Sequence, residues 1–334
     1  MSDYRYQPLT DQWILIAGNR EQRPNDYVQS QVVSHDRPCP FCLGNESETP
    51  EAIVTYPDDQ IREWSIRVFA NKYPALSPVA NEPRQTRGPY TSFHGFGQHE
   101  LIVLSPRHIE SFTELTSEER QLSLHAFQQR LLRTYEDAAI SHAVVFQNCR
   151  VDAGASVQHV HCQLIGTTIV PPTIELIAQR QQQYRTQHGQ SLLQSIATTE
   201  LADSCRVVAE TDHFLAFCPF ASRQPFETWV TPKLPDDCRS FFQLPHPELD
   251  ELSELIQLVV ANIEKLYPKI AYNMILHVPP KSANWREGRG TWYVEIFPRI
   301  NKTAGFEWAT GCMINQVAPE IAAQRLRADV MSSG

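Results

Sequence analysis

Five residues near the middle of the chain, His159-Val160-His161-Cys162-Gln163, combine side chains that can act on a phosphoryl group. On a β-strand, alternate residues share a face, so both imidazoles and the Gln163 amide would project together. A neutral imidazole can attack phosphorus if its other ring nitrogen is held as a hydrogen-bond donor. The Gln163 amide could stabilise charge on a phosphoryl oxygen. The spacing favours phosphoryl-group chemistry over the alternative that alternate histidines merely line a half-buried strand.

A run of small residues, Ala153-Gly154-Ala155-Ser156, comes just before this strand. Small residues let the backbone approach an anion closely, and amides in such a loop can donate to it. The Ser156 hydroxyl is a further donor for a phosphoryl oxygen. The loop together with the histidine strand therefore predicts a phosphate-binding site.

A second motif, Cys39-Pro40-Phe41-Cys42, supplies two thiolates with the spacing of a tetrahedral zinc site. The chain has no second Cys-x-x-Cys pair, so a four-cysteine ribbon is excluded and the remaining ligands must be distant histidines. His108 and His159 could be brought together by pairing of adjacent strands. One histidine of the His-x-His pair would then serve the metal and the other the chemistry. A redox pair, or two unrelated thiols, are the alternatives that spacing leaves open.

These motifs lie within a succession of elements that occurs twice. A strand ending in a residue plus proline is followed by an amphipathic helix, a second strand and a last strand. In the first copy, Thr116 and Glu119 form a capping-box pattern at the start of the helix. The expected elements cover residues 99–108, 116–135, 143–146 and 157–163 in the first copy, and 226–233, 249–266, 272–277 and 291–298 in the second.

The repetition predicts an α+β fold made of two duplicated units, with antiparallel sheets and helices packed on one face. We expect an N-terminal catalytic and zinc unit over residues 1–168, a connecting segment over 169–211, and a C-terminal unit over 212–334. A polar, Gln-rich helix around residues 174–187 is expected to be solvated. The histidine constellation occurs in one copy only, which predicts one active centre per chain, in the first half.

Composition limits the class of function. The 334 residues include 29 Lys+Arg and 38 Asp+Glu, so the formal charge is 29 − 38 = −9. That balance disfavours non-specific nucleic-acid binding, which depends on basic residues. No apolar run of about 18 residues would span a bilayer, and the N-terminus lacks the apolar segment of a signal peptide. We therefore expect a cytoplasmic protein without a membrane or nucleic-acid partner.

In its motifs the chain resembles the galactose-1-phosphate uridylyltransferase family, a branch of the histidine-triad superfamily built from two fused histidine-triad-like units. The order and spacing of the motifs carry the resemblance through most of the chain. They are Pro8-Leu9-Thr10-Asp11-Gln12-Trp13, Arg20-Glu21-Gln22-Arg23-Pro24, Cys39-Pro40-Phe41-Cys42, Asn71-Lys72-Tyr73-Pro74, Gly97-Gln98-His99-Glu100, Ser105-Pro106-Arg107-His108, residues 148–163, Pro225-Phe226-Glu227-Thr228 and Gly305-Phe306-Glu307.

The resemblance implies a ping-pong nucleotidyl transfer. His161, the second histidine of His-x-His-x-Gln, would attack the α-phosphorus of a nucleoside-diphosphate sugar such as UDP-glucose and carry the nucleoside monophosphate covalently. A hexose 1-phosphate or inorganic phosphate would then accept it. The resemblance also implies one structural zinc held by Cys39, Cys42, His108 and His159, and a homodimer. The remaining implied substrate contacts are Gln163 and Ser156 at the phosphates, Asn148 near the sugar phosphate, Arg20 and Arg23 as cationic partners, Asn71 near the nucleoside, the amides around Gly154, and Phe306 and Glu307.

Two departures from the family pattern bear on substrate. The uridylyltransferases usually read His-Pro-His-Gly-Gln, whereas Val160 and Cys162 stand here, a form that resembles the ADP-glucose phosphorylase branch. The alternatives are therefore adenylyl transfer from ADP-glucose to inorganic phosphate, a nucleotide-sugar hydrolase, or a non-catalytic nucleotide-binding protein. Some relatives carry a second metal in the C-terminal half. Tyr293 and Glu295 replace ligand-type histidines there, so no second metal is expected.

Overall fold

Ten strands form a single antiparallel sheet that runs through both halves of the molecule. The computed structural model describes residues 2–18, 38–57, 63–79, 84–233, 240–283 and 292–327. Along the sheet, the strand order is β10-β11-β12-β14-β13-β8-β9-β7-β4-β3. The first half supplies β3 (Ala52–Tyr56), β4 (Ile66–Ala70), β7 (Gly97–Val103), β8 (His142–Cys149) and β9 (His161–Thr167), and the second half supplies β10 (Val207–Glu210), β11 (Phe214–Phe217), β12 (Thr228–Pro232), β13 (Tyr272–His277) and β14 (Tyr293–Pro298).

The expected duplication is visible in this order. In the first half β9 lies between β7 and β8, and in the second half β14 lies between β12 and β13. The α+β class with antiparallel strands is therefore confirmed. The two units do not keep separate sheets, however, because β8 and β13 pair at the centre with Asn148 opposite Asn273. Pairing satisfies backbone groups that two free sheet edges would otherwise expose.

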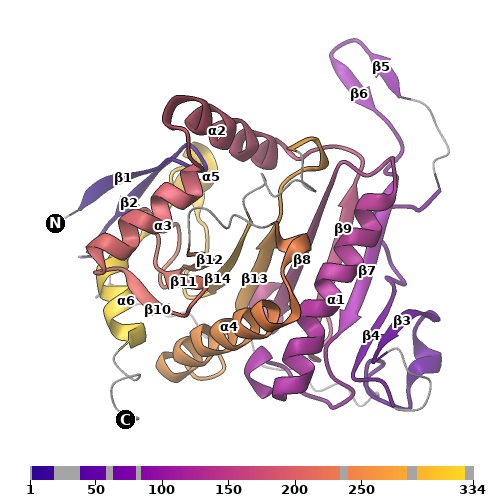
Figure 1. Ribbon diagram of the computed structural model, residues 1–334. Helices are drawn as coiled ribbons and strands as arrows, with labels where there is room; N and C mark the ends of the chain where they lie inside the picture. Colours follow the sequence, from indigo (N-terminus) through magenta and orange to yellow (C-terminus); the bar gives the residue numbers. More distant parts are fainter. Residues whose placement is uncertain are drawn as a thin grey trace.

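Two long helices, α1 (Ser117–Glu136) and α4 (His246–Leu266), cover one face of this sheet (Figure 1). Thr116 caps the N-terminus of α1 as predicted: its hydroxyl accepts from the Glu119 amide, and the Glu119 carboxylate accepts from the Thr116 amide. The apolar sides of both helices enter one hydrophobic core that draws residues from both halves. The shared core and shared sheet together make one body of the two units.

The segment between the halves contains two helices with different environments. α2 (Pro172–His188) has no buried residue, as expected for a solvated helix. α3 (Leu192–Asp203) buries Leu192 and Leu193 in a cluster with Trp229, on the sheet face opposite α4. Helices are therefore not confined to one face, because the second half has apolar side chains on both faces of its strands. The expected unit boundaries at residues 168 and 211 stay a prediction.

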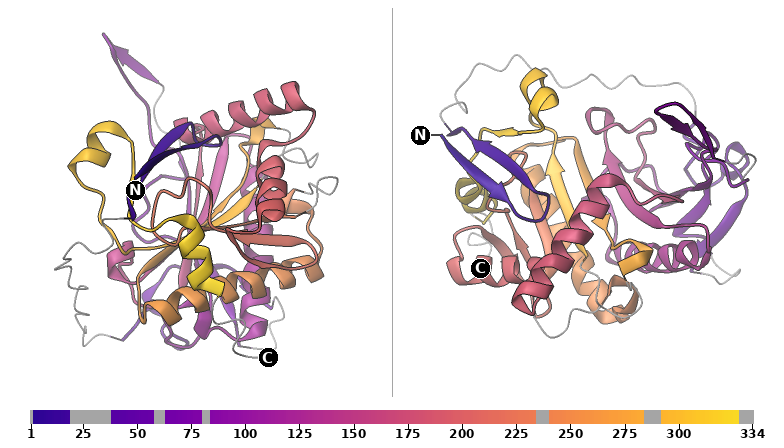
Figure 2. Two further views of the ribbon diagram at one scale, coloured as in Figure 1. Left: turned by 90° about the vertical axis from the view of Figure 1, so that its left-hand side faces the viewer. Right: turned by 90° about the horizontal axis from the view of Figure 1, so that it is seen from above.

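The remaining elements are peripheral. β1 (Asp3–Gln7), β2 (Gln12–Ile16) and β15 (Ile314–Asn315) form a small sheet, and β5 (Gln85–Arg87) with β6 (Tyr90–Ser92) forms a hairpin that projects from the body (Figures 1 and 2). The other helices are α5 (Gly305–Thr310), α6 (Pro319–Arg327) and the 3-10 turns Glu46–Glu48, Phe112–Glu114, Val151–Ala153, Phe241–Gln243 and Lys281–Ala283.

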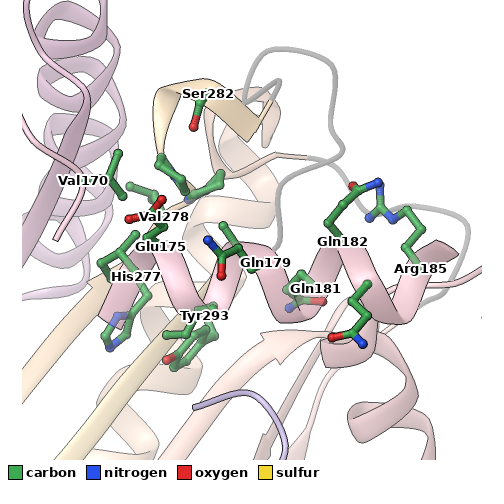
Figure 3. Close-up of a pocket in the computed structure, with 16 residues that line it drawn as sticks. Val170, Glu175, Gln179, Gln181, Gln182, Arg185, His277, Val278, Ser282 and Tyr293 are labelled. Carbon is green, nitrogen blue, oxygen red and sulfur yellow. The ribbon is translucent and has the colours of Figure 1, made fainter. Parts of the chain in front are cut away.

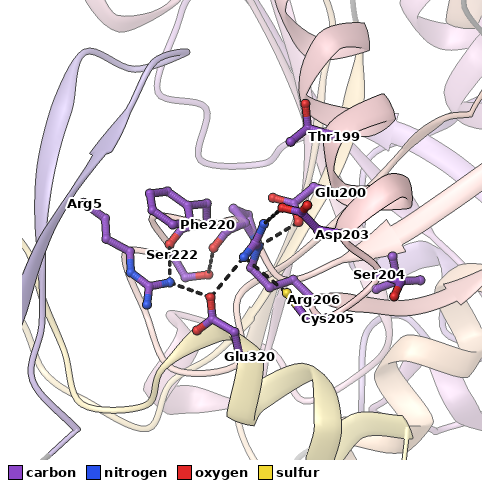
Figure 4. A network of polar contacts seen from close by, with 12 residues as sticks. Arg5, Thr199, Glu200, Asp203, Ser204, Cys205, Arg206, Phe220, Ser222 and Glu320 are labelled. Atoms are coloured by element: carbon purple, nitrogen blue, oxygen red, sulfur yellow. Dashed lines mark hydrogen bonds and ion pairs between the residues drawn. The ribbon is translucent and has the colours of Figure 1, made fainter.

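A buried ion network attaches this periphery to the second half (Figure 4). Arg206 Nε donates to Glu200 of α3 at 2.7 Å, and Arg206 Nη1 lies 3.1 Å from Glu320 of α6. Glu320 also pairs with Arg5 of β1 at 2.8 Å. The N-terminal strands therefore belong spatially with α3 and α6. Within the described ranges, no helix combines the length and apolar content needed to cross a bilayer.

Candidate active site and metal centre

Cys39, Cys42, His108 and His159 come together in one cluster. Their potential ligand atoms all lie within 4.8 Å of one another. His159 Nδ1 is 3.5 Å from Cys39 Sγ, and His108 Nδ1 is 3.5 Å from Cys42 Sγ. With metal–sulfur bonds of about 2.3 Å and metal–nitrogen bonds of about 2.0 Å, a tetrahedral zinc site separates sulfur from nitrogen by roughly 3.5 Å. The cluster therefore fits a closed structural metal site.

Hydrogen bonds outside the cluster orient its ligands. His159 Nε2 donates to the Ser105 carbonyl at 2.8 Å, which leaves the Nδ1 lone pair directed at the thiols. The turn between the cysteines is closed by the Asn45 amide group, which donates to the Cys39 carbonyl at 2.8 Å. Burial and the neighbouring Cys39 raise the pKa of Cys42 to about 11. A bound divalent cation would reverse that preference, because it stabilises the thiolate.

His161 is the first residue of β9 and is buried beside the metal cluster. Its Nδ1 lies 2.6 Å from the His159 carbonyl oxygen and donates to it. Burial lowers the pKa of His161, so the imidazole is neutral at physiological pH. With the proton fixed on Nδ1, the lone pair is on Nε2. This is the state that nucleophilic attack requires.

His159 therefore has two functions in one residue. Its ring joins the metal cluster, and its backbone carbonyl holds the ring of His161. Phe41, between the two cysteines, packs edge-on against both imidazoles, with ring centroids 5.9 Å from His159 and 5.2 Å from His161. The geometry of the metal loop and the geometry of His161 are thus coupled.

Gln163 shares the sheet face of His161, as the alternation predicts, and its side-chain carbonyl is held by His99. The Ala75 amide donates to His99 Nδ1 at 3.0 Å, so the His99 proton is on Nε2. That nitrogen lies 2.9 Å from Gln163 Oε1 and donates to it. The Gln163 amide nitrogen is left as the donor. Asn71, predicted to lie near the nucleoside, is next to the same histidine, with Nδ2 3.1 Å from His99 Nε2.

The loop before β9 differs from the amide cradle expected at Gly154. The amides of Ala153, Gly154 and Ala155 donate to carbonyls of Arg150 and Val151 within the loop. Gly154 has φ +97°, a left-handed conformation that favours glycine. Gly154 therefore allows the loop to bend at this position. Ser156 follows on the exposed side of the loop.

Asn148 connects the first half of the site to the second half. Its side-chain oxygen accepts from Asn273 Nδ2 at 2.8 Å, and Asn273 also donates to the Ala153 carbonyl at 3.1 Å. A Cβ atom at Gly154 would lie 3.4 Å from Asn148 Nδ2. The Asn148 amide group therefore lies directly beside the loop.

Other predicted residues lie apart from this constellation or outside the described residues. Arg20 and Arg23 fall outside the described residues. Phe306 and Glu307 are on α5, which lies on the side of the second half beside β1 and β2 (Figures 1 and 2). There the Glu307 carboxylate accepts from the Ala304 amide and caps its own helix. In Figure 1, α5 lies apart from β9, the strand that begins with His161.

A cavity of about 800 Å³ lies in the second half, between α2 and the ends of β13 and β14 (Figure 3). His277 and Tyr293 line it with stacked rings, 4.4 Å between centroids. His277 Nε2 lies 2.8 Å from Glu295, and Arg223 pairs with the same carboxylate. The lining includes neither His161 nor the metal cluster, so this cavity is separate from the candidate site. The expectation of no second metal stays a prediction.

Two side chains of the site, His99 and Phe41, were not singled out from the sequence. The alternation of residues 97–103 is a signal that could have found His99, because it places His99 and Leu101 on one face and Leu101 pairs with Gln163. The signal for Phe41 is its position between the two cysteines, because an apolar side chain there packs against the residues beneath the metal-binding loop. Neither signal identifies the partner without the strand register.

Comparisons with known proteins match nearly the whole chain. The family model described as galactose-1-phosphate uridyl transferase, N-terminal domain, matches residues 1–171. A second model, a domain of unknown function (DUF4921), matches residues 103–333. An ADP-glucose phosphorylase of Arabidopsis thaliana is 31% identical over 97% of this chain and 92% of its own length. A galactose-1-phosphate uridylyltransferase of Thermotoga maritima is 25% identical over 98% of both chains.

Solved structures extend the likeness to the fold. The crystal structure of an ADP-glucose phosphorylase from Arabidopsis thaliana with bound ADP-glucose has a TM-score of 0.83 at 28% identity, over 98% of this chain and 99% of that one. A uridylyltransferase structure has a TM-score of 0.76 at 21% identity, over 99% of both chains, and shares the fold. The chain belongs to the galactose-1-phosphate uridylyltransferase family and is an enzyme of the nucleotidyltransferase type.

Proposed function

We propose that the enzyme transfers a nucleoside monophosphate from a nucleoside-diphosphate sugar to a phosphate acceptor through a covalent intermediate on His161. The observation that carries this proposal is the bond from His161 Nδ1 to the His159 carbonyl, 2.6 Å long. It fixes a neutral tautomer whose Nε2 lone pair is available for attack.

In the first step, Nε2 bonds to the α-phosphorus as the bond from that phosphorus to the bridging oxygen breaks. The electron pair leaves with the bridging oxygen, and a sugar 1-phosphate departs. In the second step, an oxygen of the acceptor phosphate attacks the same phosphorus and the bond to Nε2 breaks. His161 then returns to its neutral state, so atoms and charge balance over the cycle.

The remaining side chains support this chemistry as donors. The Gln163 amide nitrogen, oriented through His99, and the Ser156 hydroxyl would stabilise charge on the phosphoryl oxygens. Asn148 would contact the sugar phosphate, and Asn71 the nucleoside. Arg20 and Arg23 would supply positive charge from a segment outside the described residues.

A zinc ion would be held by Cys39, Cys42, His108 and His159, with a structural role. All four ligands come from the protein, so the site is closed to substrate. Its contribution is positional, because the His159 backbone that carries the ligand ring also holds His161. Reactivity at phosphorus stays with the imidazole of His161.

Two assignments of nucleotide and acceptor follow from the relatives. The uridylyltransferase relatives and the matched family model favour uridylyl transfer from UDP-glucose to a hexose 1-phosphate. The phosphorylase relative, together with Val160 and Cys162 in the motif, favours adenylyl transfer from ADP-glucose to inorganic phosphate. Both use the same covalent step on His161.

The test is intact-mass spectrometry of the protein mixed with UDP-glucose or with ADP-glucose, without acceptor. We expect an adduct of one nucleoside monophosphate per chain with one of the two, and its loss in His161→Gly. His188→Ala, on the exposed side of α2, is the matched control and should form the adduct normally. Addition of galactose 1-phosphate or phosphate should then discharge it. No adduct with either sugar nucleotide would refute the proposal.

We also propose a homodimer in which α5 of one chain completes the other chain's site. Phe306 is 45% exposed and Trp308 is 79% exposed, which leaves an apolar surface on this helix. Light scattering should give twice the chain mass, and Trp308→Glu should shift it toward the monomer. A monomeric wild-type protein would refute this arrangement.

A further inference from the structure

Four side chains form a row across the sheet face opposite α1 and α4, at the seam between the halves. Gln147 pairs with Cys162, so Asn148, the next residue of β8, lies beside His161. Asn148 pairs with Asn273 of β13, and Asn273 pairs with Phe297 of β14. Directly paired residues project from the same face. Because adjacent strands are about 4.8 Å apart, Asn273 is roughly 10 Å from the strand of His161.

Arg299 follows β14 and lies over the far end of this row. Its Nε donates to Asn273 Oδ1 at 2.5 Å, and its Cζ is 5.0 Å from the centre of the Phe297 ring. Asn273 in turn donates to Asn148 at 2.8 Å and to the carbonyl of Ala153 at 3.1 Å. Arg299 is thus joined to the loop before His161 through a single side chain.

The charge of Arg299 has no acidic partner among the described residues. Arg130 and Arg206, which are also withdrawn from water, pair with Glu100 and Glu200 at 2.6 and 2.7 Å. Among the described residues, the guanidinium of half-buried Arg299 contacts only Asn273 and the Phe297 ring, and burial lowers its pKa. A guanidinium has five donors, and a partly desolvated charge without a counter-ion is costly. An anion is the ligand that would satisfy it.

We propose that Arg299 binds the phosphate that leaves in the first step and attacks in the second, namely the phosphate of a sugar 1-phosphate or inorganic phosphate. This inference rests on the proposed function. In the proposed function the α-phosphorus lies at His161 Nε2 and Asn148 contacts the sugar phosphate, which places the next phosphate where Asn148 and the loop meet the second half. Gln163 and Asn148 are neutral donors, so a dianionic phosphate there needs a cation. Among the described residues, Arg299 is a cation that is hydrogen-bonded to a member of that row, Asn273.

The experiment compares Arg299→Gln and Arg299→Lys with wild type in two separate measurements. Formation of the nucleotidyl adduct on His161 is followed by intact mass, and the KM for the acceptor is measured at saturating sugar nucleotide. Loss of a charge-assisted hydrogen bond should raise the acceptor KM of Arg299→Gln by about 10- to 100-fold. Arg299→Lys keeps the positive charge but loses the planar guanidinium that can donate two parallel hydrogen bonds, so we expect the acceptor KM to rise by only about 3- to 10-fold. Because the same phosphate is part of the sugar nucleotide, both variants should still form the adduct but should need a higher concentration of sugar nucleotide to do so.

Arg133→Gln is the matched control, because Arg133 pairs on the surface with Glu136 and is 70% exposed. Its acceptor KM should equal that of wild type. If Arg299→Gln does not fold, shown by loss of its thermal transition, Arg299→Lys decides alone. An unchanged acceptor KM in a folded Arg299 variant overturns the role of Arg299. Absence of any adduct in wild type overturns the proposed function instead, so the two failures are distinguishable.

Discussion

Replacing His99 by alanine should slow nucleotidyl transfer although His99 is not expected to touch the reacting phosphorus. The substitution removes the donor that holds Gln163 Oε1 at 2.9 Å. It also frees the Ala75 amide, which donates to His99 Nδ1 at 3.0 Å. The Gln163 amide can then rotate, and its nitrogen is presented to the phosphoryl oxygen only part of the time.

The size of the effect follows from the bond that is lost. A neutral hydrogen bond contributes a net 0.5–1.5 kcal/mol or so, which corresponds to a rate loss of about 2- to 10-fold. Gln163→Ala removes the phosphoryl donor itself, and loss of such a donor typically reduces the rate by about 10²- to 10³-fold. If His99 acts only through Gln163, the double variant should be no slower than Gln163→Ala.

The assay is the single-turnover rate of adduct formation, followed by quenched-flow mass spectrometry for the four proteins of the double-mutant cycle. His99→Gln serves as the rescue, since its amide nitrogen can reach the former position of Nε2 and should restore most of the rate. Multiplicative losses in the double variant would refute the positioning role. A wild-type rate in folded His99→Ala would refute it more directly.

Three further predictions concern the metal, pH and the second half. The wild-type protein should contain one zinc per chain by elemental analysis; Cys39→Ser should lose the metal, lower the Tm and slow adduct formation, whereas Cys205→Ser, at an exposed free thiol, should do none of these. Burial lowers the pKa of His142 to about 4, below its ordinary value of 6.5, so the folded state resists protonation that the unfolded chain accepts. The unfolding free energy should therefore fall by up to about 3 kcal/mol as the pH is lowered from 6.5 to 4. In urea unfolding, His142→Asn should show a shallower fall in unfolding free energy over this pH range than wild type. An identical fall in the two proteins would contradict the assignment. Glu295→Ala removes the buried carboxylate that Arg223 and His277 share, although Arg223 keeps its ion pair with Glu227; the change should lower the unfolding free energy by about 1–3 kcal/mol, while Glu136→Ala on the surface should change it by less than about 1 kcal/mol.

Much of the fold could be predicted because its signals are local. The capping box at Thr116 and Glu119 depends on residues three apart and is present as expected. The repeated succession of strand, helix and strands reflects periodicity within each segment. The joining of the two units in one sheet was not predictable in this way, because it depends on the pairing of β8 with β13, and neither strand carries a signal for its partner.

In the candidate site, too, the features with a local signal were predicted and the others were not. Alternation in β9 placed His161 and Gln163 on one face, and the ligand types at Cys39, Cys42 and His108 predicted a metal cluster that the structure brings together. The expectation that the amides around Gly154 would face an anion was not met for Ala153, Gly154 and Ala155. A short turn satisfies those donors internally, and turn hydrogen bonds follow from backbone angles rather than from residue size.

The sequence by itself determined which residue types are available, which neighbours share a strand face and where a helix begins, because these depend on chemical identity and on backbone periods of 2 and 3.6 residues. Tertiary structure decided which of those residues act together. His99 reaches Gln163 across 64 positions of sequence, and Asn273 reaches Asn148 across 125. Such pairs are set by strand register and by the joining of the two sheets, and a one-residue slip in either would turn the side chains to opposite faces.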